Sequence, residues 1–150
     1  MNLARVAEVA AAECERQRVG VHALARLLTA YAEAEAWSIR HEVPHLDDLF
    51  DLGRLIEPVY AAQWRTTPVT FRGGGSSAHH SVIPGAMWRW VVRLPFRADI
   101  EKDPTIVDEV IKAFLDIHPF ADGNGRSAWI LRTWLLDQWE EPEPLPIYFP

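Results

Sequence analysis

Near its C-terminal end the chain reads His118-Pro119-Phe120-Ala121-Asp122-Gly123-Asn124-Gly125-Arg126 between two apolar segments. The segment before it, 104–117, begins after an Asp103-Pro104 pair. The aspartate can accept hydrogen bonds from the first turn of a helix, and a proline is tolerated there. The segment after it, about 125–139, has its apolar residues at helical spacing. We therefore expect the nine residues to form a loop that ends one buried helix and opens the next.

This loop combines a base, a carboxylate, two glycines and an arginine. Glycines let the backbone approach a ligand closely, and the first N–H groups of the following helix favour an anion. Arg126 adds a permanent positive charge. Asp122 would repel a phosphate directly, so its expected role is to hold Mg²⁺ against phosphate oxygens. His118 can take up a proton near neutral pH. The loop therefore predicts an anion site beside a base.

The same residues resemble the signature of the Fic (filamentation induced by cyclic AMP) family, H-x-F-x-D/E-G-N-G-R-x-x-R. Every specified position except the last matches in register. The family also places its signature on a loop between two helices. Coarser similarity extends over about residues 46–140, whereas residues 1–45 are not covered. The resemblance implies a mainly α, Fic-like helical bundle.

By this resemblance the protein would transfer a nucleoside monophosphate to a hydroxyl side chain of a target protein. The usual donor in the family is ATP, which transfers AMP, and Mg²⁺ is the implied metal. His118 would deprotonate the hydroxyl, Asp122 would bind Mg²⁺, and Phe120 would anchor the loop in the core. The phosphates would be held by Gly123, Asn124, Gly125 and Arg126.

A second stretch resembles the family's flap. Residues 66–72 are β-prone and are followed by the glycine- and serine-rich segment 73–77, so we expect a short β-hairpin near the active-site loop. The resemblance implies that this flap docks a segment of the target by adding a strand beside it. The flap residues are Val69, Thr70, Phe71 and Arg72.

The signature's second arginine falls on Trp129. In the family that arginine positions the γ-phosphate and pairs with an inhibitory glutamate. Arg132 lies one turn further on the same helix, about 5 Å from that position, and could cover part of the gap. The alternatives are another donor nucleotide, slow transfer, the reverse hydrolysis, or a catalytically silent module that binds a nucleotide or a protein. The family also suggests a toxin restrained by a separate inhibitory partner protein.

The rest of the chain predicts further helices in one domain, 1–150. They are expected over residues 3–18 and 21–40, from His45 toward Pro68, and over 85–94 before Pro95. Pro58 is expected to bend or shorten the third of these. The tail from Glu140 contains four prolines and cannot continue a helix.

The chief competing motif is His41-Glu42-Val43-Pro44-His45, a literal H-E-x-x-H. That pattern binds zinc when both histidines lie on one helix face. Pro44 disfavours a helix here, so the two imidazoles are not expected to stack on one helix face, and the spacing of Glu57, a third candidate ligand, is not distinctive. We interpret the segment as a helix end with exposed histidines and keep a zinc hydrolase as a remote alternative. His79-His80 is likewise expected to lie in a solvated loop with its rings apart.

Composition limits the partners. The 150 residues carry a formal net charge of −6, which argues against a large phosphate-neutralising surface for nucleic acid. No apolar run approaches the ~18 residues of a membrane span, so we expect no membrane association and a cytoplasmic location. The single cysteine, Cys14, cannot form an internal disulfide.

Overall fold

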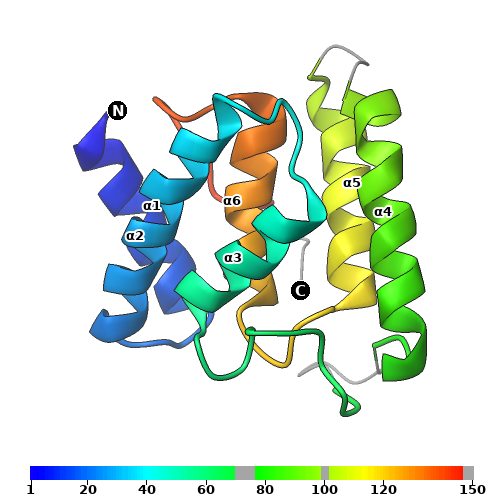
Figure 1. Cartoon of the computed structure of the whole chain (residues 1–150). Coiled ribbons are helices and arrows are strands. Elements are labelled where there is room, and N and C mark those ends of the chain that lie inside the picture. The colour runs from blue at the N-terminus through cyan, green and yellow to red at the C-terminus, as the bar shows by residue number, and fades with distance from the viewer. Residues whose placement is uncertain (70–76, 99–101, 147–150) are drawn as a thin grey trace.

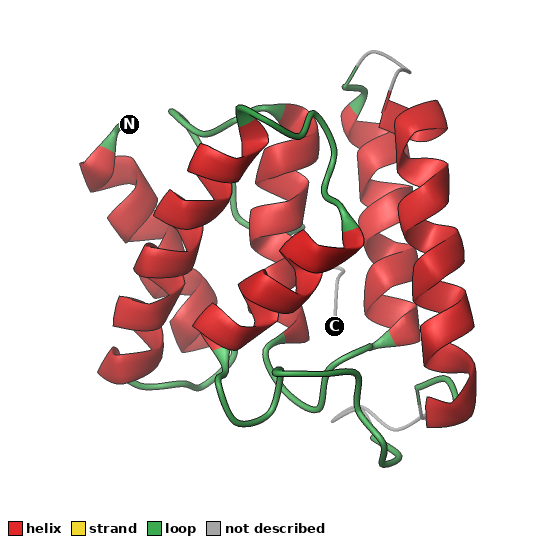
Figure 2. Cartoon of the chain, in the orientation of Figure 1, coloured by secondary structure: helices red, strands yellow, loops and turns green. Residues whose placement is uncertain are grey.

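The computed structural model describes residues 1–69, 77–98 and 102–146. These residues form six α-helices and one 3₁₀ turn, and no strand is found among them (Figure 2). The prediction of a mainly α fold is confirmed. The elements are α1 (Leu3–Arg16), α2 (Val21–Ser38), α3 (Leu46–Ile56), η1 (His80–Val82), α4 (Ile83–Ala98), α5 (Pro104–Ile117) and α6 (Asn124–Leu136).

Helix α6 lies at the centre of the molecule (Figure 1). Every residue of α6 except Gly125 is buried, and the helix contacts α1, α2, α3 and α5. A helix covered on all sides can be apolar all round, because no face of it needs to meet water. The loop before α6 therefore leads directly into the most buried helix of the described fold.

Helix α5 has the boundaries predicted from its capping residues. The Asp103 side chain accepts a hydrogen bond from the backbone N–H of Thr105 at 2.9 Å, and Pro104 occupies the first turn. Val107, Val110, Ile111 and Phe114 are buried at helical spacing. These local rules place the start of α5.

Prolines act differently in α3 and α4. Helix α3 stops at Ile56 and does not extend toward Pro68, because Pro58 disfavours a helical conformation at Glu57, whose φ is −137°. Helix α4 was expected to end before Pro95 but continues through it to Ala98. A proline removes one hydrogen bond. We attribute the continuation to packing, because Trp90 and Leu94 are buried and α4 contacts α5.

The expected β-hairpin flap is not seen. Val69 and Ser77 are described as irregular chain, and the Val69 carbonyl accepts hydrogen bonds from the Ser77 N–H at 3.2 Å and the Ser77 hydroxyl at 3.1 Å. Thr70, Phe71 and Arg72 lie outside the described residues. The two described ends of the segment therefore meet without forming a strand.

The proline-rich tail is not helical over its described residues, as predicted, yet it packs against the bundle. Leu145 is buried, and its N–H donates to the Glu13 carboxylate in α1 at 2.8 Å. The indole N–H of Trp129 donates to the Glu143 carbonyl at 3.0 Å. The tail thereby connects the first helix to the central one.

Candidate functional site

His118 sits where α5 ends. Its backbone is left-handed, with φ 52° and ψ 63°, and its N–H donates to the Phe114 carbonyl at 3.0 Å. A left-handed residue reverses the chain after a helix, and a residue other than glycine adopts this conformation uncommonly. The reversal directs the chain from α5 into the loop that opens α6, and the His118 side chain is half-buried there.

Arg65 braces this reversal from the segment that follows α3. Its Nε donates to the His118 carbonyl at 2.6 Å. Its two terminal nitrogens donate to the carbonyls of Thr67 at 2.9 Å, Ile117 at 3.3 Å and Ala78. The side chain is buried, and burial lowers the pKa of the guanidinium, although an arginine keeps its charge. Arg65 is not predictable from the sequence, because nothing in its local pattern marks it as a partner of a residue 53 positions away.

The surroundings of His118 favour its neutral form. Burial lowers the pKa of the imidazole below its ordinary value, and the positive charge of Arg65 lowers it further. A hydrogen bond with the Leu115 backbone and the negative charge of Asp122 act in the opposite direction but do not overcome these two effects. A neutral imidazole can accept a proton, as a general base must.

Phe120 fixes the loop in the core. Its ring is 1% exposed and lies 5.3 Å from the Trp64 ring, centroid to centroid. A Cβ at Gly53 would lie 2.8 Å from the same ring and 2.5 Å from the Ala61 carbonyl, so α3 needs a glycine at this point. The Asn124 side chain bonds both the N–H and the carbonyl of Phe120, at 2.9 and 2.8 Å. The side-chain amide of Asn124 is thus used to hold the loop. Its backbone N–H is the first N–H group of α6.

The two glycines of the loop both allow close packing. Gly123 has a φ of 82°, and its N–H donates to the Asp122 carboxylate at 2.7 Å. A Cβ at Gly123 would also lie 3.1 Å from the Ile56 side chain. A Cβ at Gly125 would lie 2.9 Å from the Gln17 side chain at the end of α1. Both glycines therefore bring the first turn of α6 against neighbouring helices.

Arg126 is fully buried in a network of charges. It donates to Glu57 at 2.8 Å and lies 3.4 Å from the Asp122 carboxylate. Glu57 also pairs with Arg26 of α2 at 3.1 Å. The carboxylate of Glu57 thus lies between two arginines at the end of α3, an arrangement that the sequence analysis did not find. Asp122, in contrast, has a side chain that is 54% exposed.

Trp129 and Arg132 have their partners outside the loop. The Trp129 indole is fully buried and stacks on Tyr31 of α2, with centroids 5.2 Å apart. Arg132 pairs with Asp108 of α5 at 2.7 Å and with Glu143 of the tail at 3.4 Å. It lies eight residues after the start of α6, about 12 Å along the helix axis. The structure does not bring Arg132 to the loop.

The donor set around Asp122 fits a magnesium ion. Mg²⁺ is usually held by one or two carboxylates, with water and substrate phosphates completing its shell. An exposed carboxylate beside the first turn of a helix meets that requirement.

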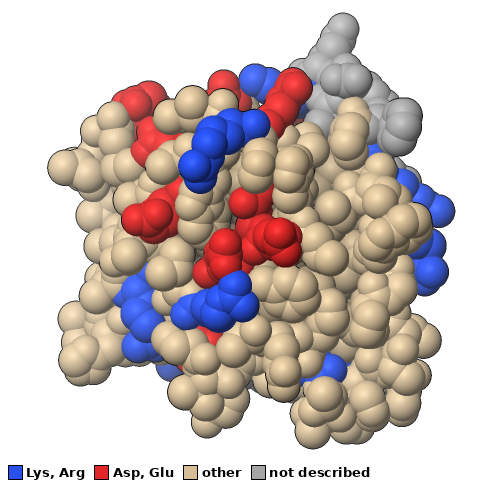
Figure 3. Space-filling model, in the orientation of Figure 1, with Lys and Arg blue, Asp and Glu red and all other residues tan. Residues whose placement is uncertain are grey.

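The surface shows no broad basic stripe on the face drawn in Figure 3. Lys and Arg side chains lie there in separate groups, and Asp and Glu side chains gather between them. In the described part of the chain, no helix is long and apolar enough to cross a bilayer.

Comparison with known proteins places these observations in a family. The Fic/DOC family model matches residues 45–136. The solved structures of similar fold include two of Fic-1 from C. elegans. The first, residues 134–508, has a TM-score of 0.66 at 23% identity and covers 82% of this chain. The second, the same segment carrying E274G, has a TM-score of 0.64 at 21% identity and covers 83% of this chain.

The chain spans 38% and 39% of the length of those two structures. No curated protein matches it. The family match covers most of the chain and contains the whole 118–126 loop, which stands between two helices as the signature requires. The chain belongs to the Fic/DOC family.

Proposed function

We propose that this protein is a Fic-type transferase that moves a nucleoside monophosphate, AMP in the first instance, onto a hydroxyl side chain of a target protein. One observation carries the proposal. A half-buried imidazole, held in its neutral form, ends α5 one short loop before the N-terminal turn of a buried helix. A base beside an anion-binding turn is what transfer from a nucleotide to a hydroxyl requires.

In this proposal His118 removes the proton from the attacking hydroxyl. The oxygen then bonds to the α-phosphorus of the donor while the bond to the β-phosphate oxygen breaks, so pyrophosphate leaves. Arg65 takes no part in bonding. It holds the His118 backbone in place and helps to keep the imidazole unprotonated before the proton transfer.

The phosphates would lie against the first backbone N–H groups of α6, at Asn124, Gly125 and Arg126. Asp122 would hold Mg²⁺, which supplies positive charge to the phosphate oxygens. The buried guanidinium of Arg126 belongs to the same turn, and its positive charge would also favour an anion there. To bind a phosphate directly, that guanidinium would have to exchange Glu57 for the ligand.

Target docking rests on the family resemblance. Val69, Thr70, Phe71 and Arg72 would line the segment that pairs with the target backbone. Such pairing does not depend on the target's side chains. A separate inhibitory protein, a toxin role and a cytoplasmic location remain part of the same proposal.

Labelling with radioactive nucleotides tests the activity. The protein is incubated with cell lysate, Mg²⁺ and each α-labelled nucleoside triphosphate in turn, and labelled protein bands are counted. We expect labelling by the wild type and its loss in His118→Ala. His118→Asn is a second variant, because asparagine tolerates the left-handed backbone at this position. His22→Ala, at an exposed position on α2, is the matched control and should label normally. Equal labelling by the wild type and both His118 variants would refute the role of the base.

A catalytically silent, nucleotide-binding module is the second candidate. Two observations favour it: Trp129 stands where the signature has an arginine, and Arg126 is already paired with Glu57. This reading predicts saturable binding of ATP with Mg²⁺ by calorimetry, and no labelled band with any donor. Labelling by the wild type that is lost in the His118 variants would exclude it.

A further inference from the structure

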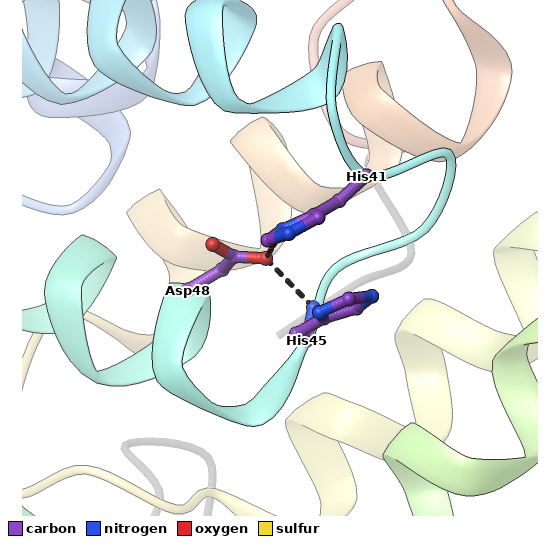
Figure 4. Close-up of side chains that lie close together, drawn as sticks. All are labelled: His41, His45 and Asp48. Atoms are coloured by element: carbon purple, nitrogen blue, oxygen red, sulfur yellow. Dashed lines mark hydrogen bonds and ion pairs between the residues drawn. The ribbon is translucent and has the colours of Figure 1, made fainter.

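The turn between α2 and α3 holds the H-E-x-x-H motif. Residues 41–45 are not helical, so the geometry of the zinc-protease pattern is not formed, as Pro44 predicted. The two imidazoles nevertheless stack, although not on a helix face. The rings of His41 and His45 lie 3.7 Å apart, centroid to centroid, with an interplanar angle of 19° (Figure 4). The turn between the helices brings them together without any shared helix face.

Asp48 joins the two histidines from the first turn of α3. Its Oδ2 lies 2.7 Å from His41 Nδ1 and accepts a hydrogen bond from the His45 backbone N–H at 2.8 Å (Figure 4). Among the described residues, no Lys or Arg lies within ion-pair distance of this buried carboxylate, and His41 is its one titratable partner there. One ligand atom from each of the three side chains lies within 4.8 Å of the other two. Glu57, the third ligand considered from the sequence, pairs with arginines instead.

We propose that His41, His45 and Asp48 bind a divalent transition-metal ion of the zinc class. Imidazole nitrogen and carboxylate oxygen are the donors that zinc takes in proteins. Each neutral imidazole offers one nitrogen lone pair, and a carboxylate supplies negative charge. The site is independent of the transferase proposal, because none of its ligands belongs to the 118–126 loop.

The required rearrangement is small. Zinc–nitrogen bonds of about 2.0–2.1 Å in a tetrahedral site place neighbouring ligand atoms roughly 3.3 Å apart. His41 Nδ1 and Asp48 Oδ2 are already 2.7 Å apart, so they must separate by about half an ångström when the metal replaces the shared proton. The ring of His45 must rotate out of its stack, and its exposed side chain leaves room for this. A water would complete the shell.

The position of the site predicts what the metal does. His41 follows α2, while His45 and Asp48 begin α3, so one ion would fasten the two helices together. Glu42 is exposed and is not part of the cluster of three. We therefore assign the site a structural role and no hydrolytic one.

Zinc titration of the full chain tests the proposal. Protein stripped with a chelator is titrated with Zn²⁺ by calorimetry, and its thermal unfolding is followed with and without Zn²⁺. We expect one ion per chain and a higher midpoint of unfolding with the metal. His45→Ala, at an exposed position, and Asp48→Asn, which keeps an oxygen acceptor for the His45 N–H, should each weaken binding by about 10-fold or more.

The second histidine pair of the chain provides the control. His79 and His80 also stack, with centroids 4.2 Å apart, against the expectation from the sequence, but the described residues offer them no third ligand. The double variant His79→Ala/His80→Ala should bind Zn²⁺ like the wild type. A wild type that does not bind Zn²⁺, or equal affinities in the wild type and His45→Ala, would overturn the proposal. Binding lost only in the His79/His80 variant would also overturn it.

Discussion

At the residue scale, one set of contacts fixes the position of His118 and another sets its protonation. Its backbone is fixed by the left-handed end of α5 and by a hydrogen bond from Arg65, while its side chain is half-buried beside the Arg65 charge. The first effect sets where the imidazole lies, and the second sets its protonation. Separating them requires a change at Arg65 rather than at His118.

Replacing Arg65 should shift the titration of His118 in a predictable direction. Arg65→Met removes the charge, so the pKa of His118 should rise toward about 6.5. Arg65→Lys keeps the charge and should leave the lowered pKa in place. NMR titration of the imidazole measures both. In the proposed mechanism the neutral ring is the base, so the acid limb of any transfer activity should move to higher pH in Arg65→Met. Identical titration curves in all three proteins would show that burial alone sets the pKa.

The same shift affects stability. The pKa of His118 is lower in the folded chain than in the unfolded one, so the unfolded state takes up the proton first as the pH falls. The free energy of unfolding should therefore fall below about pH 6.5 because of this group. The fall should stop once the pH is below the pKa of His118 in the folded chain.

At the scale of elements, α3 packs closely against the loop because residue 53 is a glycine. Gly53 is buried within α3, and the Phe120 ring and the Ala61 carbonyl occupy the space where its Cβ would be. The backbone of the helix therefore contacts the loop anchor directly. Any side chain at this position must displace the ring, the carbonyl or the helix.

Gly53→Ala should destabilise the fold and disturb the loop. Overpacking of a buried contact costs about 2 kcal/mol, and urea unfolding measures it. Gly85→Ala in α4 is the matched control. A Cβ at Gly85 would lie 3.4 Å from the Arg89 side chain, which is ordinary contact. We therefore expect the free energy of unfolding to rise by roughly 0.5 kcal/mol, because alanine has the higher helix propensity. A Gly53→Ala protein as stable as Gly85→Ala would contradict the close packing of α3 on Phe120.

At the scale of the whole molecule, Trp129, which stands where the signature has an arginine, is part of the core. The indole stacks on Tyr31 of α2 and donates to the tail at Glu143. The Tyr31 hydroxyl in turn donates to the Trp139 carbonyl at 2.6 Å. Trp129 thus joins the central helix, an N-terminal helix and the tail.

Restoring the arginine should therefore cost stability. Trp129→Arg removes a fully buried indole and leaves a charge in its place, which we expect to cost about 4 kcal/mol. Trp88→Arg, at a position 59% exposed on α4, should change stability by no more than about 0.5 kcal/mol. Urea unfolding of both variants provides the comparison. If Trp129→Arg unfolds at the same urea concentration as Trp88→Arg, position 129 has space for an arginine side chain.

Local sequence signals accounted for the helices and for the loop. Asp103 and Pro104 placed the start of α5, Pro58 shortened α3, and the residues from His118 to Arg126 placed the junction between α5 and α6. Each of these signals acts within a turn or two of the chain, through a cap, a missing N–H group or a left-handed residue. This is why the sequence predicts them, whereas the prediction that α4 ends before Pro95 is wrong because α4 packs against α5.

Tertiary structure alone decided which side chains surround the loop and which meet elsewhere. Arg65 reaches His118 across 53 positions, Glu57 reaches Arg126 across 69, and the stacking of His41 on His45 depends on how α2 turns into α3. Such contacts follow from the relative placement of packed helices, and no periodicity within one segment encodes that placement. The sequence by itself determined the family and the chemical groups of the loop; the packing of the helices decided the protonation of its histidine and the partner of its arginine.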